Sequence, residues 1–143
     1  GDQMNVDKNQ IKVGNFAKDY GFDIGETGGG CTALMKYITD DFYMMITDDA
    51  EVPGSLDDAA TIGIYVDDWD CVFEGRMTTK DALSFGYWVN ECVQSYFSDA
   101  NFPTNTIEQL LNKHNLNDQD LWSAIELCID SILEKGETLW KLN

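Results

Sequence analysis

Carboxylates are the side chains of this sequence that could do chemistry, and they occur in two groups. Oxygen ligands of this kind suit Ca²⁺ or Mg²⁺, and paired carboxylates can act as acid and base in hydrolysis. Neither group has the spacing of an EF-hand loop, so the sequence names no metal, and aspartates are in any case common in solvated turns. The first group is Asp40, Asp41, Asp67, Asp68 and Asp70, and the second is Asp48, Asp49, Glu51, Asp57 and Asp58.

The single histidine, His114, lies in a polar stretch between Lys113 and Asn115. Its position near the end of a predicted helix favours an interaction with the carbonyl dipole over a role as a catalytic base. Ser-His or Cys-His catalysis would need an oriented nucleophile beside it, and nothing in the sequence places one there. We therefore predict no catalytic residue and no cofactor.

Three consecutive glycines, Gly28, Gly29 and Gly30, separate two extended runs. Glycine loops can hold phosphate when they open a helix, but this one precedes a strand-like run and lacks the P-loop pattern. The neighbouring Glu26 would also repel an anion. A structural turn is the better interpretation.

The charge of the 143-residue chain is one-sided, with a formal net charge of -17. Residues 37 to 75 contain eleven acidic residues and no Lys or Arg. Such a surface disfavours direct binding to nucleic acid or to an anionic membrane. It is compatible with a solvated acidic surface or with a surface for a basic partner.

The elements that would position these carboxylates follow from hydrophobic periodicity. Apolar residues alternate across residues 31 to 47 and 61 to 66, which predicts half-buried strands. We expect an α+β fold, with an antiparallel meander of four or five strands within residues 22 to 75, followed by about three helices within residues 78 to 136 that pack on it. A meander would bring the first carboxylate group to one end of the sheet, and the second group to the other end with the glycine turn.

Capping residues predict the helix boundaries. Residues 1 to 10 are expected to fray, and a short helix to run from a cap at Asn15 to a stop at Gly21. The later helices are expected to be capped by the pairs Thr78 with Asp81 and Asn105 with Glu108, and by Asn117 with a stop at Gly136.

Cys31, Cys71, Cys92 and Cys128 each fall in an apolar pattern, which predicts buried, reduced thiols and a cytoplasmic location. No run of apolar residues is long enough to span a membrane. One domain is expected over residues 1 to 143. The apolar tail, Leu139, Trp140 and Leu142, is expected to dock on its own domain or on a second copy, giving a monomer or a homodimer.

A resemblance can be placed on three segments: Glu26 to Ala33 (ETGGGCTA), Ile46 to Asp49 (ITDD) and Ile62 to Tyr65 (IGIY). These segments resemble a group of small uncharacterised phage-encoded and phage-related proteins that share an E-T-G-G-x-C-T-A turn. The likeness covers residues 15 to 85 and implies a phage or prophage source, a host-cell location and a small α+β module, with no activity to transfer.

Two classes of function follow as hypotheses. The first is a non-enzymatic module whose acidic surface binds a basic host or phage protein, in one form as a mimic of nucleic acid; a structural virion or assembly protein is a variant of it. The second is a metal-dependent enzyme that uses the aspartate groups. The absence of a catalytic signature in the sequence favours the first.

Overall fold

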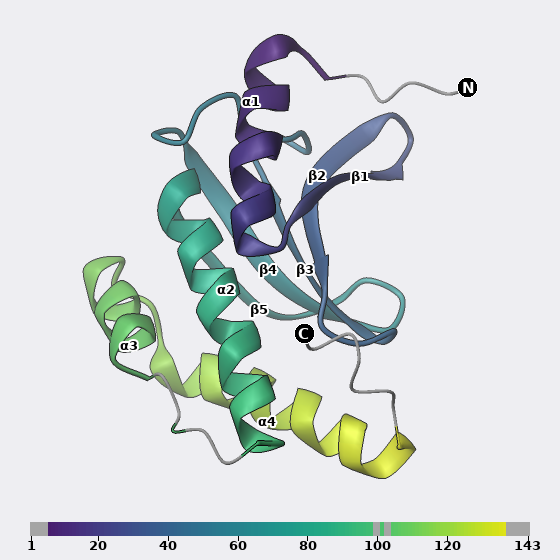
Figure 1. Ribbon diagram of the computed structural model, residues 1–143, viewed down its shortest axis with the longest axis vertical. Helices are drawn as coiled ribbons and strands as arrows, with labels where there is room; N and C mark the ends of the chain where they lie inside the picture. Colours follow the sequence, from purple (N-terminus) through teal and green to yellow (C-terminus); the bar gives the residue numbers. More distant parts are fainter. Residues whose placement is uncertain (1–5, 99–100, 102–103, 137–143) are drawn as a thin grey trace.

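The computed structural model describes residues 6–98, 101 and 104–136, and it contains one antiparallel sheet with helices beside it (Figure 1). The five strands lie in sequence order, β1-β2-β3-β4-β5, and each pairs antiparallel with the next. This arrangement confirms the predicted α+β meander. The strands are β1 (Asp23–Gly28), β2 (Cys31–Tyr37), β3 (Phe42–Thr47), β4 (Ala59–Val66) and β5 (Asp70–Thr78). The helices are α1 (Lys8–Ala17), the short 3₁₀ helix η1 (Lys18–Tyr20), α2 (Thr79–Tyr96), α3 (Thr104–Lys113) and α4 (Asp118–Lys135).

The first helix corrects two expectations. Helix α1 begins at Lys8, so residues 8 to 10 are helical rather than frayed, and Asn15 lies inside the helix. Asp7 is the cap: its carboxylate accepts from the Gln10 N–H at 2.9 Å, and the Gln10 side chain accepts from the Asp7 N–H at 2.7 Å. This reciprocal pair satisfies two backbone donors that would otherwise lack partners. The predicted stop is confirmed, because Gly21 follows η1 with φ of 83°.

The three glycines form the predicted turn between β1 and β2. All three have positive φ, at 105°, 60° and 81°. Side chains other than glycine seldom adopt such angles, so three in succession require this residue type. The turn does not precede a helix, which agrees with the prediction of a structural role.

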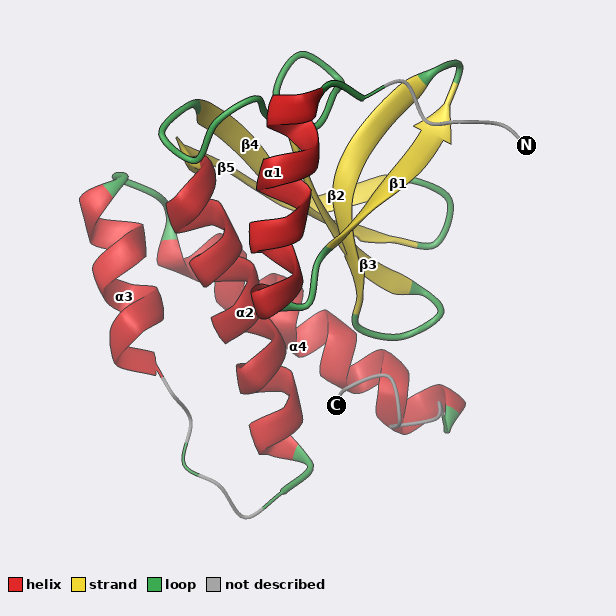
Figure 2. Cartoon of the chain, turned by 45° about the horizontal axis from the view of Figure 1, so that its top comes forward, coloured by secondary structure: helices red, strands yellow, loops and turns green. Residues whose placement is uncertain are grey.

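One face of the sheet forms the core. Helices α1 and α2 lie on the same side of it (Figure 2). The side chains at the centre of this core come from alternate strand positions and from the apolar side of α2, and they are fully buried. They include Leu34, Met44, Ile46, Ile62, Ile64, Leu83 and Phe85. The alternation in the sequence therefore identifies the core face correctly.

The helices after the sheet begin largely as expected. The Thr78 hydroxyl accepts from the Asp81 N–H at 3.2 Å and caps α2, while Asn117 caps α4 and Gly136 ends it in the left-handed conformation. Asn105 is not a cap, because α3 begins one residue earlier at Thr104. The spacing of Asn105 and Glu108 suggested a capping box, but Asn105 already lies within the helix.

The opposite face carries a second, smaller cluster. Ala33, Tyr43 and Met45 are buried there, and Met35 and Tyr65 pack against them. Among the residues that the structure describes, the side chains of this cluster come from β2, β3 and β4. We call this side the outer face.

The cysteines follow the prediction in part. All four are thiols, and Cys92 and Cys128 are buried. Cys31 is half-buried and Cys71 is exposed, because Cys71 pairs with Tyr65 on the outer face. Among the described helices, none is long and apolar enough to be a membrane span. Leu139, Trp140 and Leu142 lie outside the described residues.

Candidate functional site

The meander places the two carboxylate groups at opposite ends of the sheet. We call the β2–β3 and β4–β5 turns, residues 38–41 and 67–69, with the strand residues that flank them, the turn end. The Asp67 N–H donates to the Asp41 carbonyl at 2.8 Å, which joins the two turns directly. The turn end therefore brings together Asp40, Asp41, Asp67, Asp68 and Asp70.

We call the β1–β2 turn with the β3–β4 loop, residues 48–58, the loop end. Asp48 and Glu51 exchange two backbone hydrogen bonds around Asp49 and Ala50, both of which have positive φ. Such a tight turn needs residues that tolerate the left-handed region, as aspartate does. The Ala50 carbonyl accepts from the Thr32 N–H at 3.2 Å, which ties this loop to the start of β2 beside the glycine turn.

The loop end also holds the start of α2. The Asp58 carbonyl accepts from the Thr79 N–H at 2.8 Å and from the Thr79 hydroxyl at 2.9 Å. The side chains of Asp57 and Asp58 are exposed beside this helix N-terminus. It is therefore the backbone of Asp58 that holds the start of the helix, and negative charge near a helix N-terminus is in general favourable.

At the turn end a row of aromatic rings lies on the outer face, and the charges of Asp68 and Asp70 act on one of its members, Tyr43. Tyr37, Tyr43 and Tyr65 are directly opposed across β2, β3 and β4. Their ring centroids lie 5.4 Å and 5.5 Å apart, and the Tyr43–Tyr65 pair is stacked. The Trp69 ring adds an edge-on contact with Tyr43 at 5.8 Å. We call these four residues the aromatic row.

Trp69 is held in an unusual conformation. Its φ is 73°, in the left-handed region that a bulky residue rarely adopts and that costs on the order of 1–2 kcal/mol. The Tyr43 hydroxyl accepts from the Trp69 N–H at 3.1 Å, and the ring contact with Tyr43 adds to this restraint. The side chain nevertheless stays 52% exposed. Strain kept for an exposed ring is a reason to suspect function.

The phenols of Tyr43 and Tyr65 are neutral near pH 7, because the pKa of each is raised. Burial raises the pKa of Tyr65 to about 12, and the charge of Glu74 contributes. Burial also raises the pKa of Tyr43, and the nearby charges of Asp68 and Asp70 act in the same direction. The row is thus an uncharged, hydrogen-bonding and apolar strip within an acidic rim.

The described residues contain no group of three or more His, Cys, Asp or Glu side chains arranged to hold a metal ion. At the turn end one carboxylate has a cation beside it: the Asp41 carboxylate lies 3.0 Å from the Lys135 ammonium of α4. The aspartates that could have been metal ligands therefore lie at two separate ends of the sheet. At neither end do the described residues form a group that could hold a metal ion.

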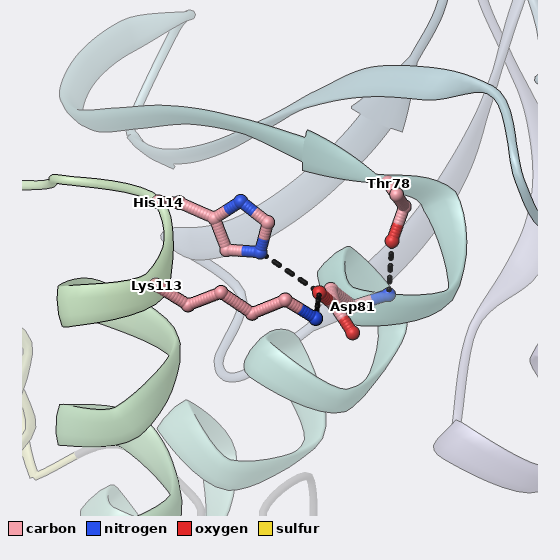
Figure 3. Close-up of polar contacts among 4 residues, drawn as sticks. All are labelled: Thr78, Asp81, Lys113 and His114. Carbon is pink, nitrogen blue, oxygen red and sulfur yellow. Dashed lines mark hydrogen bonds and ion pairs between the residues drawn. The ribbon is translucent and has the colours of Figure 1, made fainter.

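His114 takes part in a contact that the sequence did not indicate (Figure 3). Its Nε2 lies 2.8 Å from Asp81 Oδ2, and the Lys113 ammonium is also 2.8 Å from that oxygen. Burial alone would raise the pKa of Asp81, but the hydrogen bonds from Lys113 and His114 outweigh it and lower the pKa. This Asp81–Lys113–His114 clasp joins the end of α3 to the first turn of α2, with only 14% of the His114 side chain exposed.

Comparison with known proteins yields no match: no protein-family model, no curated protein and no solved structure is similar to this chain. The resemblance to small phage-related proteins therefore stays a prediction, and function has to be argued from the site itself.

The sequence signals for the aromatic row were present. Tyr37, Tyr43 and Tyr65 occupy the strand positions that alternate with the core residues, so the period-2 pattern already placed them on the second face. Their mutual contacts depend on strand register, which the pattern alone does not determine. The left-handed conformation of Trp69 had no signal in its residue type.

Proposed function

We propose that this protein is a non-enzymatic binding module whose turn end binds a basic protein partner. The observation that carries the proposal is the exposure of Tyr37 and Trp69, at 48% and 52%, within a packed aromatic row and between two acidic turns. Exposed aromatic rings alone, or acidic turns alone, would be ordinary on a protein surface. Their combination at one end of the sheet suits a partner that presents positive charge together with flat side chains that can pack on the rings.

The aromatic row supplies the contact surface. Tyrosine and tryptophan carry much of the binding energy at protein interfaces, and they lose little entropy when they are already held in place. The stacking of Tyr43 on Tyr65 and the bond from Trp69 to Tyr43 hold this row before any partner arrives. Arginine and lysine side chains can also lie over such rings through cation–π attraction.

The acidic rim supplies selectivity and speed. Asp40, Asp67, Asp68 and Asp70 are exposed around the row, and Glu74 is exposed on β5. With a net charge of -17 the whole chain attracts a basic protein, and the rim directs that protein to the rings. Neutral or acidic surfaces are disfavoured by repulsion and by unpaired charge.

The partner in this proposal is a basic protein of a host cell or of a phage, in line with the resemblance to phage-related proteins. If that partner normally binds nucleic acid, the carboxylates of the turn end stand in for phosphates. Duplex DNA would then compete with this protein for the partner, whereas a partner that uses another surface would be insensitive to DNA.

The proposal is tested with two matched triple variants and a defined probe, an oligoarginine peptide. Asp67, Asp68 and Asp70 are changed to Asn at the turn end, and Asp49, Asp57 and Asp58 to Asn at the loop end. Asn keeps the turn chemistry and removes only the charge. At low salt we expect the turn-end variant to weaken peptide binding about tenfold, chiefly through the on-rate, and the loop-end variant to change it by less than about twofold.

Equal weakening by the two variants would show that the peptide responds to overall charge, and it would contradict a localised site. Circular dichroism of both variants checks that the fold is intact. Capture of cellular proteins by the wild type and by the turn-end variant, with and without duplex DNA, then identifies the natural partner and tests the mimicry.

A further inference from the structure

A hollow lies on the core side of the sheet, on the opposite face from the aromatic row. It has a volume of about 280 Å³ and lies where η1, β2 and α2 meet. Figure 1 shows the end of α1, where η1 follows, beside α2. Its lining includes Lys18, Tyr20, Lys36, Tyr87, Glu91 and Gln94. We call it the Lys36 pocket.

Lys36 is an unusual residue for its position. It pairs with Met44 in the register of β2 and β3, on the side of the sheet that bears the buried core residues Leu34 and Ile38. Its amine lies against the backbone of Gly21, and any side chain at Gly21 would collide with it. Burial lowers the pKa of Lys36, while the charge of Glu91 acts to raise it.

Glu91 is the opposing charge in the pocket. It is half-buried on α2, one turn after Tyr87, whose hydroxyl is hydrogen-bonded to it; the charge of Glu91, burial and this hydrogen bond all raise the pKa of the Tyr87 hydroxyl. Within the part of the chain that the structure describes, neither Lys36 nor Glu91 belongs to an ion pair. The pocket thus holds a cation and an anion that interact electrostatically but do not form an ion pair. The Glu91 carboxylate has the Tyr87 hydroxyl as a hydrogen-bond partner, but among the described residues neither it nor the Lys36 ammonium contacts an opposite charge. Partly buried charges in this situation are normally satisfied by water or by a ligand.

We propose that the Lys36 pocket binds a small zwitterion that carries one carboxylate and one ammonium group, which is the chemistry of a free amino acid. The Lys36 ammonium pairs with the ligand carboxylate, and Glu91 pairs with the ligand ammonium. The rings of Tyr20 and Tyr87, in edge contact at 6.3 Å, offer an apolar wall for the ligand side chain. The site is separate from the turn end and does not depend on the function proposed there.

The charges of the pocket exclude the simpler classes of ligand. Lys18 and Asp19 at the rim repeat the pairing of opposite signs in the interior. A polyanion such as a nucleotide would meet Glu91 and Asp19, and a simple cation would meet Lys36 and Lys18. A ligand with both charges satisfies both groups, and a volume of about 280 Å³ lies near the lower limit of small-molecule sites.

The first experiment compares three probes on the unmodified protein by NMR chemical-shift titration. L-Phenylalanine carries both charges, its amide lacks the carboxylate, and N-acetyl-L-phenylalanine lacks the ammonium. We expect L-phenylalanine to bind with a millimolar or lower Kd and to shift amide signals in residues 18–21 and 87–94. Each analogue should bind at least about tenfold more weakly, since it leaves one buried charge unpaired. No binding by L-phenylalanine, or equal binding by an analogue, would overturn the proposal.

The second experiment assigns the contacts to residues. Lys36→Met keeps the aliphatic stem and removes the amine, and Glu91→Gln keeps the shape and removes the charge. Each should weaken L-phenylalanine binding about tenfold, whereas the controls Lys12→Met and Glu134→Gln, both exposed and elsewhere, should leave it unchanged. If the pocket variants bind like the wild type, the shifts arise at another place and the proposal fails. Because the probe comparison needs no variant, a misfolded Lys36→Met protein would not prevent the test.

Discussion

The loop end and the turn end are both rich in carboxylates, but they are built differently. At the loop end backbone hydrogen bonds tie the acidic segment to β2 and to the start of α2, and the Asp81 carboxylate in the first turn of that helix holds α3. At the turn end the Asp67–Asp41 bond joins the two turns and the Asp41 carboxylate pairs with Lys135 of α4, and the exposed rings of Tyr37 and Trp69 lie on the outer face beside the acids. The comparison teaches that acidity alone does not identify a binding surface, and that what the acids surround is more informative.

Replacing Trp69 by Gly should have the largest effect on this contrast. Glycine suits φ of 73°, so the backbone strain is relieved and the free energy of unfolding should stay equal or rise by up to about 1 kcal/mol. Binding of an oligoarginine peptide should weaken by about 30-fold or more, since a central tryptophan at an interface contributes about 2 kcal/mol or more. Titration calorimetry measures the binding, and unfolding in urea measures the stability. A variant that binds as well as the wild type would show that Trp69 is only a turn residue.

Asp81→Asn tests whether the acid at the start of α2, the helix that the loop end holds, serves structure. It removes a charge that accepts from Lys113 and His114, and we expect a loss of about 2 kcal/mol in the free energy of unfolding at neutral pH. Because the pKa of Asp81 is lowered in the folded state, its stabilisation is present above the pKa of the unfolded chain. It is lost as pH falls through the folded pKa, so the difference from the wild type should close below about pH 4.

The matched control for this variant is Asp118→Asn. Asp118 also lies in the first turn of a helix, α4, and it is exposed. The Asp118→Asn change should lower the free energy of unfolding by only about 0.3–0.5 kcal/mol, through the loss of its interaction with the helix dipole. If the two variants lose equal stability, the clasp adds nothing beyond the dipole, and the contrast between the ends weakens.

The parts of the fold that sequence could predict are those set by local periodicity. Alternating apolar residues gave the strands and both faces, and the caps at Thr78 and Asn117 gave two helix starts. The stop of the first helical segment at Gly21 was predicted, but the start of α1 was placed at Asn15 instead of Lys8, although Asp7 and Gln10 have the spacing of a capping box. That signal was available and was not used.

The parts of the site that sequence could not predict depend on long-range geometry. The Asp81–His114 contact joins residues 33 positions apart, and the Tyr43–Trp69 bond joins residues 26 positions apart. Cys71 was expected to be buried because it falls in an apolar pattern with Val72 and Phe73. A register shift between Ile64 and Tyr65 pairs it with Tyr65, and its thiol is exposed.

The two accessible thiols allow the ends to be tested separately. Cys71 lies at the turn end and Cys31 at the glycine turn of the loop end, while Cys92 and Cys128 are buried. Labelling Cys71 with a maleimide in Cys31→Ser protein should weaken oligoarginine binding about fivefold, since the label crowds the aromatic row. The same label on Cys31 in Cys71→Ser protein should have no effect. Burial and the charge of Glu74 raise the pKa of Cys71, so its labelling should be slow at neutral pH and should become faster as the pH rises. Equal loss of binding after either label would argue against a local site.

The smallest expected effect is on the free energy of unfolding of the two triple variants, which should change in opposite directions. At low salt Asp67, Asp68 and Asp70 repel one another across a turn that holds them close, so changing them to Asn should raise the free energy of unfolding by about 0.5 kcal/mol. At the loop end Asp57 and Asp58 lie beside the positive end of α2, so changing them with Asp49 should leave stability unchanged or lower it by about 0.5 kcal/mol. Urea unfolding at low and at physiological salt measures both, and screening should shrink both differences. The opposite signs are what matter, because a uniform solvated surface would gain stability equally at either end. Equal gains would mean that the acids of the loop end have no structural role, and the distinction between the two ends would then depend on the aromatic row alone.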